Sequence, residues 1–474
     1  MAEISFGDIQ IRTAKQTGGQ SDQGQFKIAV LGDFSADQTV PAFKSYRVDR
    51  DDFDDLIAKI NPKLNLSFSN ASTDSIELSF SDLEDFHPDH LYSEVSLFGK
   101  LRNIRKKLQN KSTFDEAAQQ VYQWLGKGEV EDNTAVEIKA EQDIAPNSTT
   151  EKKSTLNLDD VLAATSQQTK ENQANETSES SLAKSLIAQV IAPYVIPKAD
   201  PRLAELIEGV DLAIANLMRL ILHHPSFVAL EASWVSLYSL VKEIETDSKL
   251  TIEVWNLPLT VLAEDLSHNE DLTQCHFYKK TIQETLQTAG GKPYSLMLGL
   301  YQINSDEEQC ALLGRVANIC TQGNTVFVTN ASWSLLGLNN PNSKVDTDII
   351  ASKISQDCPL GDTLWKSLRS LTISEYLGLT FPRYAVRYPY GKKSSPIEKF
   401  QFQELLAQEE HQGIAGGYGC VAVGILLAQS FRQIGNQFSP GEISTFEKVP
   451  TLLIEEEGET ITLKTAVRPA QYIA

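Results

Sequence analysis

The sequence predicts a mixed α/β fold, with a smaller and a larger globular unit joined by a flexible acidic segment. Short apolar runs alternate with longer stretches whose apolar residues recur at helical spacing, as in strands linked by crossover helices. A polar stretch over residues 128–180 interrupts this alternation. At 474 residues the chain is also too long for one ordinary core. We therefore expect domains over residues 1–127 and 181–474.

The first unit is predicted to be a small α/β domain. Acidic residues in the first turn and apolar residues at helical spacing indicate a helix over residues 51–60, which Asn61-Pro62 ends. Alternating apolar residues indicate a pair of strands after it. The expected elements are a strand over 26–31, the helix over 51–60, strands over 64–68 and 76–80, and helices over 95–108 and 114–125.

The stretch over residues 128–180 is rich in Glu, Asp, Gln, Asn, Ser, Thr and Lys. Such a composition buries too little apolar surface to offset the entropy lost on ordering, so we expect a flexible linker. Within it, residues 156–165 can form one short amphipathic helix. A short apolar island in a polar tether is typical of a docking peptide.

The second unit is predicted to be a larger α/β sheet domain. A long helix over residues 201–222 has apolar residues at helical spacing and ends at His223-His224-Pro225. After it, strands and crossover helices alternate. The expected elements are helices over 227–241, 307–320 and 421–433, and strands over 251–257, 294–301 and 325–329.

Charge and cysteine content exclude several classes of protein. The formal charge of −21 disfavours nucleic acid and anionic membrane surfaces, and the basic run over residues 100–107 fits the wet face of a helix. The five cysteines stand far apart and form no C-x-x-C pair, so reduced core thiols are expected. No basic leader and no apolar stretch of membrane length is present, which predicts a cytoplasmic protein without membrane insertion.

Candidate metal and catalytic sites are few. His223-His224 and His87-Pro-Asp89-His90 each allow a metal site, but both also fit helix ends, which we favour. The glycine-rich stretch over residues 413–420 allows a phosphate cradle or a reactive Cys420 thiolate at a helix start. No nucleophile elbow, zinc-protease motif or Walker loop is present. We expect no catalytic residue, no metal and no cofactor.

Arg383 and Arg387 form the richest local constellation in the chain. They lie among three tyrosines and two prolines. Paired arginines in such a setting indicate either an anion site or an interface, because guanidinium groups bind carboxylates and prolines fix extended backbone. With no base or nucleophile beside them, an interface or structural role is the favoured interpretation.

Several sequence blocks carry a resemblance to a known family. Residues 1–127 resemble the small subunit of the type VI secretion sheath, the TssB or VipA family, and the remainder resembles the large subunit, the TssC, VipB or ImpC family. The first resemblance rests on Ile28-Ala-Val-Leu-Gly-Asp-Phe-Ser35, Arg47-Val-Asp-Arg-Asp-Asp-Phe-Asp54, Asn61-Pro-Lys-Leu-Asn65 and Phe80-Ser-Asp-Leu-Glu-Asp-Phe-His-Pro-Asp89. The second rests chiefly on Leu158-Asp-Asp-Val-Leu-Ala-Ala-Thr165, Ile221-Leu-His-His-Pro-Ser-Phe-Val-Ala-Leu-Glu-Ala-Ser-Trp234, Leu364-Trp-Lys-Ser-Leu-Arg369 and Tyr376-Leu-Gly-Leu-Thr-Phe-Pro-Arg383.

This resemblance implies a structural protein of a contractile sheath, with both subunits in one chain. In that family, protomers stack around an inner tube protein on a baseplate and contract, and a ClpV-type AAA+ ATPase then disassembles the sheath through an N-terminal helix of the large subunit. Residues 156–165 match that helix, with Leu158, Val161 and Leu162 as the expected anchors. The implied partners are other sheath protomers, as copies of this chain or as separate subunits.

Two departures from the family pattern lead to an alternative expectation. Gly417-Tyr-Gly-Cys420 replaces a tryptophan-glycine-asparagine block, and the sequence ends at Ala474, where large subunits usually continue through further strands. Those strands link neighbouring protomers by β-addition. The alternative is therefore a capping or regulatory protein that joins a sheath but does not extend it.

Overall fold

The structure is a computed structural model of the 474-residue chain. It describes residues 24–36, 41–68, 75–110, 112–124, 202–288, 290–304, 306–332, 335, 359–381, 383–392, 394–405, 415–438, 443, 452–456 and 459–463. Residues 24–124 are called the N-terminal part below, and residues 202–463 the C-terminal part. The predicted linker with its helix over residues 156–165, and Cys358, lie outside the described residues.

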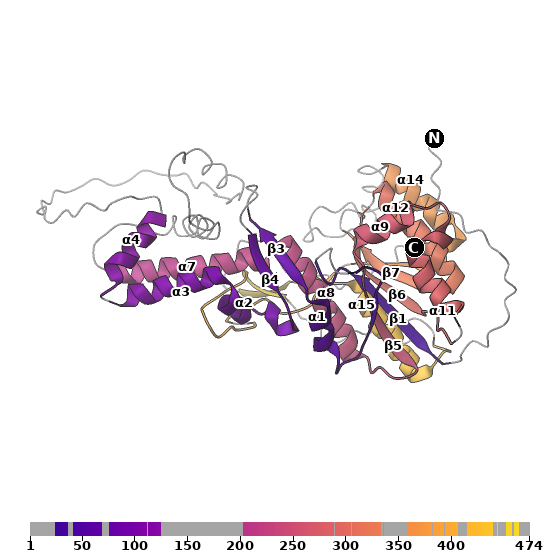
Figure 1. Ribbon diagram of the computed structural model, residues 1–474, viewed down its shortest axis with the longest axis horizontal. Helices are drawn as coiled ribbons and strands as arrows, with labels where there is room; N and C mark the ends of the chain where they lie inside the picture. Colours follow the sequence, from indigo (N-terminus) through magenta and orange to yellow (C-terminus); the bar gives the residue numbers. More distant parts are fainter. Residues whose placement is uncertain are drawn as a thin grey trace, which may run out of the picture.

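A six-stranded sheet forms the centre of the globular end of the molecule (Figure 1). Its spatial order is β2-β5-β1-β6-β7-β8. All neighbouring pairs are parallel except β2 with β5. The strands are β1 (Phe26–Gly32), β2 (Ser45–Val48), β5 (Leu250–Asn256), β6 (Leu296–Ile303), β7 (Val326–Ala331) and β8 (Leu377–Thr380).

Strand β1 belongs to the N-terminal part but lies between two strands of the C-terminal part. It pairs in parallel with β5 along its whole length, from Phe26 opposite Leu250 to Gly32 opposite Asn256, and with β6 on its other side. Ile28 and Val30 face one core, while Ala29 and Leu31 face the other. Because a central parallel strand is buried on both faces, a continuous apolar run is what this position requires. The two parts therefore share one sheet.

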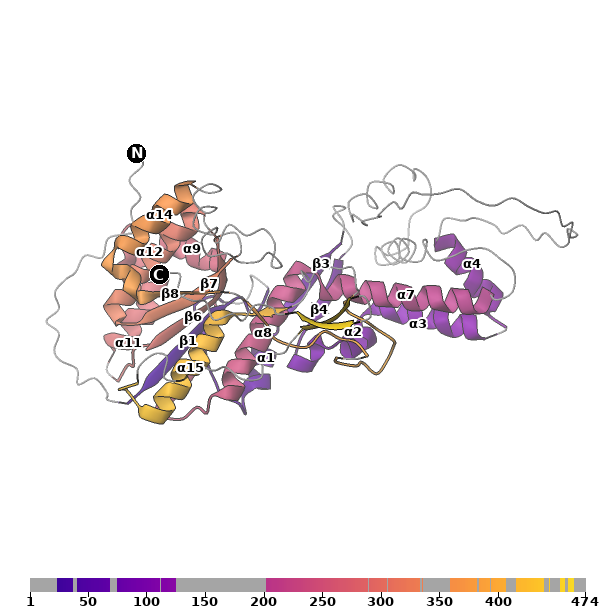
Figure 2. The same cartoon turned by 180° about the vertical axis from the view of Figure 1, so that it is seen from behind.

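Helices cover both faces of the sheet, which gives three layers (Figures 1 and 2). α8 (Pro225–Glu243) and α15 (Gly419–Ile434) contribute Leu240 and Val421 to the core that contains Val30. α9 (Leu259–Ser267), α12 (Glu307–Gly323) and α14 (Pro359–Ser370) contribute to the opposite core. The α/β fold class predicted from the sequence is confirmed.

An elongated arm extends from the sheet, and helices from both parts of the chain build it (Figure 2). α3 (Ser96–Gln109) of the N-terminal part runs beside α7 (Arg202–Leu222) of the C-terminal part, whose 21 residues span roughly 30 Å. Apolar residues at helical spacing on both, such as Leu101 and Ile214, bury the seam. The other elements of the N-terminal part are α1 (Phe53–Ile60), the hairpin of β3 (Lys63–Ser67) and β4 (Ser75–Ser79), η1 (Leu83–Phe86), α2 (Pro88–Glu94) and α4 (Phe114–Trp124).

The remaining elements are short. β11 and β12 pair as an antiparallel hairpin, and β9 pairs with β10 beside the start of α15. The segment from η3 to α11 contains one π-helical turn. The bounds of these short elements are η3 (Leu272–Gln274), α10 (His276–Tyr278), η4 (Lys279–Gln283), α11 (Glu284–Leu286), η6 (Thr372–Tyr376), β9 (Tyr384–Ala385), β10 (Gly416–Gly417), β11 (Leu452–Glu456) and β12 (Glu459–Leu463).

Most strands and helices predicted within the described residues occur within a few positions of their expected bounds. Strand β1 of the first unit lies between β5 and β6 of the other part, so the two predicted units share one sheet. The predicted boundaries at residues 127/128 and 180/181 fall outside the described residues and stay a prediction. Among the described residues, no helix is long and apolar enough to cross a membrane.

Candidate functional site at the seam between the two parts

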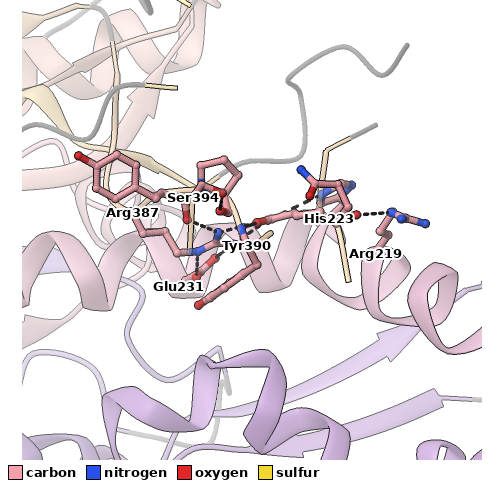
Figure 3. A network of polar contacts seen from close by, with 10 residues as sticks. Arg219, His223, Glu231, Arg387, Tyr390 and Ser394 are labelled. Carbon is pink, nitrogen blue, oxygen red and sulfur yellow. Dashed lines mark hydrogen bonds and ion pairs between the residues drawn. The ribbon is translucent and has the colours of Figure 1, made fainter. Parts of the chain in front are cut away.

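Arg387 lies at the centre of a buried cluster of charges between α8 and the segment that follows β9 (Figure 3). Its Nε is 2.5 Å from Oε1 of Glu231, and its two terminal nitrogens are each 2.8 Å from an oxygen of Glu404. Glu231 and Glu404 are 1% and 0% exposed. A guanidinium fork bound to two carboxylates from opposite sides fixes the geometry of all three side chains.

The cluster consists of two carboxylates and one guanidinium group that are buried away from solvent. Burial raises the pKa of Glu231, and the nearby Arg387 opposes this shift. Burial by itself lowers the pKa of Arg387, but Glu231 and Glu404 outweigh it and raise that pKa well above its ordinary value. Arg387 therefore stays charged, and either carboxylate would be strongly destabilised without it.

The segment over residues 387–392 and 394–405, called the strap below, wraps around this cluster. The N–H of Tyr390 donates to Glu404 at 2.6 Å, and the Tyr390 ring lies 4.2 Å from the guanidinium of Arg387. At the other end of the strap, Arg219 of α7 donates to the carbonyl of Gln403 at 2.9 Å. The strap is thus tied to α7 and α8, both in the C-terminal part.

The same strap also contacts α2 of the N-terminal part. The Asp89 carboxylate accepts hydrogen bonds from the N–H groups of Glu398 and Lys399, at 3.0 and 2.9 Å. The rings of Tyr92 and Phe400 stack with centroids 4.6 Å apart. The charge cluster therefore anchors a strap that joins the two parts of the chain.

A second contact joins the parts where strand β1 ends. The side-chain oxygen of Asn256 accepts hydrogen bonds from the N–H groups of Phe34 and Ser35, at 3.0 and 3.1 Å, and its amide donates to the Ser35 hydroxyl at 3.0 Å. Trp234 of α8 donates to the Phe34 carbonyl at 3.0 Å. All four residues are buried. The C-terminal part therefore satisfies several polar groups of the turn after β1, in addition to local bonds such as that from the Ala36 N–H to Asp33.

A third contact links the arm helices. Arg105 of α3 donates to both carboxylate oxygens of Asp211 on α7, at 2.6 and 3.0 Å. Both side chains are about two-fifths exposed, so this ion pair contributes little to stability. It sets the register of two helices whose apolar faces supply most of the stabilisation.

Comparison with known proteins identifies both parts. The family model VipB, described as EvpB/VC_A0108, tail sheath N-terminal domain, matches residues 204–466, which is more than half of the chain. The chain belongs to the VipB family of tail sheath proteins. A second model, described as type VI secretion system, VipA, VC_A0107 or Hcp2, matches residues 7–127. The strap and the shared sheet thus join a VipA-like part to a VipB-like part, which confirms the fused organisation predicted from the sequence.

One curated relative matches part of the chain. The type VI secretion system sheath protein TssC1 of Pseudomonas aeruginosa is 29% identical over 265 residues, which cover 56% of this chain and 52% of that protein. The chain thus spans about half the length of the curated relative that it matches.

The two arginines singled out from the sequence have different partners in this VipB-family chain. Arg387 binds Glu231 and Glu404, whereas Arg383 donates to the carbonyl of Gly416 and lies over the ring of Tyr418, 4.4 Å from its centroid. They therefore do not converge on one anion. Their assignment to an interface or structural role stays a proposal.

The histidine pairs lie at helix starts beside the same seam. His224 and His87 accept hydrogen bonds at the beginnings of α8 and α2, and His223 lies 3.9 Å from Glu404. His90 lies 3.3 Å from Asp85. In the described part of the chain, no three His, Cys, Asp or Glu side chains converge as a group that could hold a metal.

Cys420 opens α15 but is fully buried beneath the sheet. It is 0% exposed, its N–H donates to Asn330 at 3.1 Å, and burial raises its pKa to about 12. A reactive thiolate needs the opposite shift, so the burial of Cys420 argues against the reactive-thiol alternative that the sequence allowed. The glycine-rich stretch instead lets the short strand β10 pack closely, since a Cβ on Gly417 would meet Tyr384 at 2.7 Å.

An open crevice lies at the carboxyl ends of β1, β5 and β6. Asp33, Thr260 and Gln302 line its sheet side, while Lys63 and Glu77 of the β3–β4 hairpin line the other. Residues from the VipA-like and VipB-like parts thus shape this surface together.

Sequence reasoning found Arg387 but missed the residues that give it a role. Glu231 carries a usable signal, because it is a charged residue inside an otherwise apolar helical run. Glu404 and Asn256 carry none, since each lies among polar neighbours or at a strand end that suits many side chains. Asn256 acts on residues of the other part of the chain, and Glu404 acts on Arg387, 17 residues away, through a fold of the backbone that the sequence does not reveal.

Proposed function

We propose that this chain is a structural protomer of a type VI secretion contractile sheath, with the small and large subunits fused in one polypeptide. Membership of the VipB family and the VipA match support this role. The relative TssC1 is named as a sheath protein of the same secretion system. The proposed role is structural and uses no catalytic residue, metal or cofactor.

The observation that carries the proposal is the position of β1 between β5 and β6. A sheet whose middle strand comes from the VipA-like part cannot be completed by the VipB-like part alone. Fusion supplies the two parts in equal number and at high effective concentration, so that each chain folds as one complete protomer. Covalent linkage thereby removes a separate assembly step.

The proposed partners follow from this role. Other protomers, copies of this chain or separate subunits, form the sheath around an inner tube protein on a baseplate, in the cytoplasm. Arg383 and Arg387 act within the protomer, holding the strap and β9–β10 in place. A ClpV-type AAA+ ATPase recognises the linker through Leu158, Val161 and Leu162.

Electron microscopy of the purified full chain tests the proposal. We expect negatively stained tubules or rings, both alone and after mixing with separate VipA-type and VipB-type subunits. Cys420→Ala serves as the control variant that keeps the buried seam intact, and it should assemble equally well. If only short particles form, and if they stop the growth of tubules from the separate subunits, the chain caps sheaths and the protomer assignment is wrong.

The linker peptide allows a separate test. Leu158→Asp with Leu162→Asp should weaken binding of the full chain to the N-terminal domain of a ClpV-type ATPase at least about tenfold, because both changes remove apolar anchors. Fluorescence anisotropy with the labelled chain measures the affinity. The control pair Asn157→Asp with Thr165→Asp adds the same charge without removing an anchor, and it should bind as the unmodified chain does. Equal affinity for both pairs would refute the anchor assignment.

A further inference from the structure

Two helices that meet at the seam begin with the same unusual cap, a histidine followed by proline. His87 precedes Pro88 at the start of α2, and His224 precedes Pro225 at the start of α8. In each case Nδ1 of the imidazole accepts a hydrogen bond from the N–H two residues on, that of Asp89 at 3.2 Å and that of Ser226 at 3.3 Å. Ser, Thr, Asp and Asn are the common residues at this position, and none of them gains a proton near neutral pH.

An imidazole can accept at Nδ1 only while that nitrogen is unprotonated. Protonation converts Nδ1 into a donor that faces another donor, so the hydrogen bond is lost. The new positive charge also lies at the positive end of the helix dipole, which disfavours it further. Each histidine–proline cap is therefore open to disruption by a modest fall in pH.

Both caps contact the opposite part of the chain. The His87 ring of the VipA-like part meets the Tyr390 ring of the strap edge-on, with centroids 5.1 Å apart. The His224 ring of the VipB-like part meets Phe68, which directly follows β3, with centroids 5.5 Å apart. α2 carries Asp89, which holds the strap, and α8 carries Glu231, which anchors it. A loosened cap thus acts on the contacts between the two parts.

From these contacts we propose that the two histidine–proline caps form an acid-sensitive device, which holds the VipA-like and VipB-like parts together near neutral pH and loosens their seam in mild acid. The inference concerns the folded chain and does not depend on its role in a sheath.

The charged groups around His87 determine the direction of its response. Asp89, Glu84 and Glu398 favour the protonated ring, whereas burial and Arg387 oppose it. Burial is the largest influence, and the pKa of His87 lies below its ordinary value. A lowered pKa means that the folded state binds fewer protons than the unfolded state, so stability is present above pH 6.5 and falls as the pH drops through the lowered value.

The surroundings of His224 are simpler. The uncharged ring of Phe68 faces it from the hairpin, and among the described residues no ion pair involves its ring. The neighbouring His223 faces the other way, toward Glu404 at 3.9 Å. Because His223 lies next to the charge cluster, it is kept unchanged in any test.

Amide hydrogen exchange on the full chain tests the device locally. The variant His87→Asn with His224→Asn keeps a side-chain acceptor at both caps but removes its titration. At pH 7.5 the first turns of α2 and α8 should exchange at the same rate in both proteins. At pH 5.5 we expect about fivefold faster exchange in the unmodified protein, since one cap is worth about 1 kcal/mol. Comparison at equal pH cancels the intrinsic pH dependence of exchange.

A control histidine and an internal reference complete the design. His268→Asn changes a histidine at the end of α9 that caps no helix start, and it should leave the acid response intact. The start of α9 has no side-chain cap, so within the unmodified protein its exchange, corrected for intrinsic rate, should not respond. Because this comparison is made within the unmodified protein, it remains valid even if a variant folds poorly. If the α2 and α8 starts respond to pH no more than the α9 start, the proposal is wrong.

Discussion

Arg387→Ala is expected to lower the free energy of unfolding by about 3–5 kcal/mol, because it leaves the buried Glu231 and Glu404 without a cation. Both carboxylates lie in a place that water hardly reaches, and Glu404 also holds the N–H of Tyr390. The loss should appear as a lower urea midpoint, followed by circular dichroism. Exchange of strap amides should rise in the same variant.

The matched control is Arg432→Ala. Arg432 also binds two carboxylates, those of Glu245 and Asp247, but all three side chains are well exposed. Surface ion pairs contribute little, so we expect a loss of at most about 1 kcal/mol. Replacing the whole buried cluster by neutral residues, with Arg387→Met, Glu231→Gln and Glu404→Gln, should recover part of the stability lost in Arg387→Ala. Equal losses for Arg387→Ala and Arg432→Ala would show that the buried cluster has no special role.

Splitting the chain within the linker, into residues 1–150 and 151–474, should give two pieces that are recovered together in equal amounts. The reason is that β1 supplies the middle of the sheet, and without it the edges of β5 and β6 lose their hydrogen-bond partners. Residues 151–474 expressed alone are expected to aggregate. Co-purification through a tag on the shorter piece measures the association.

Two substitutions at one position sharpen this experiment. Val30→Pro removes an N–H from the centre of β1 and should abolish co-purification, because proline is not tolerated in a central strand. Val30→Ala keeps the backbone hydrogen bond, so the two pieces should still associate. A longer piece that is monomeric and unfolds cooperatively by itself would contradict the shared-sheet interpretation.

Local physics explains why many elements could be predicted from the sequence. The helix over residues 53–60 has its apolar residues on one face and acidic residues in its first turn, and these features act within a few residues. The strand over residues 26–32 is apolar on both faces, which predicts a buried strand but says nothing about which strands lie beside it. Pairing partners more than 200 residues away leave no local signal.

In the candidate site, too, some features could be predicted from the local sequence and others could not. Arg387 stood out because of its local setting, yet its carboxylate partners come from α8 and from the far end of the strap. The histidine–proline caps were visible as helix ends, but only the folded chain shows that both lie at one seam and contact opposite parts.

The sequence alone determined that this is a VipA-like and a VipB-like part in one α/β chain, because family motifs and hydrophobic periodicity are written in consecutive residues. Only the tertiary structure decided that the two parts are one fold rather than two joined domains. The physical reason is that burial and hydrogen bonding are satisfied by whatever lies nearby in space. For β1 and Arg387, those neighbours are far away along the chain.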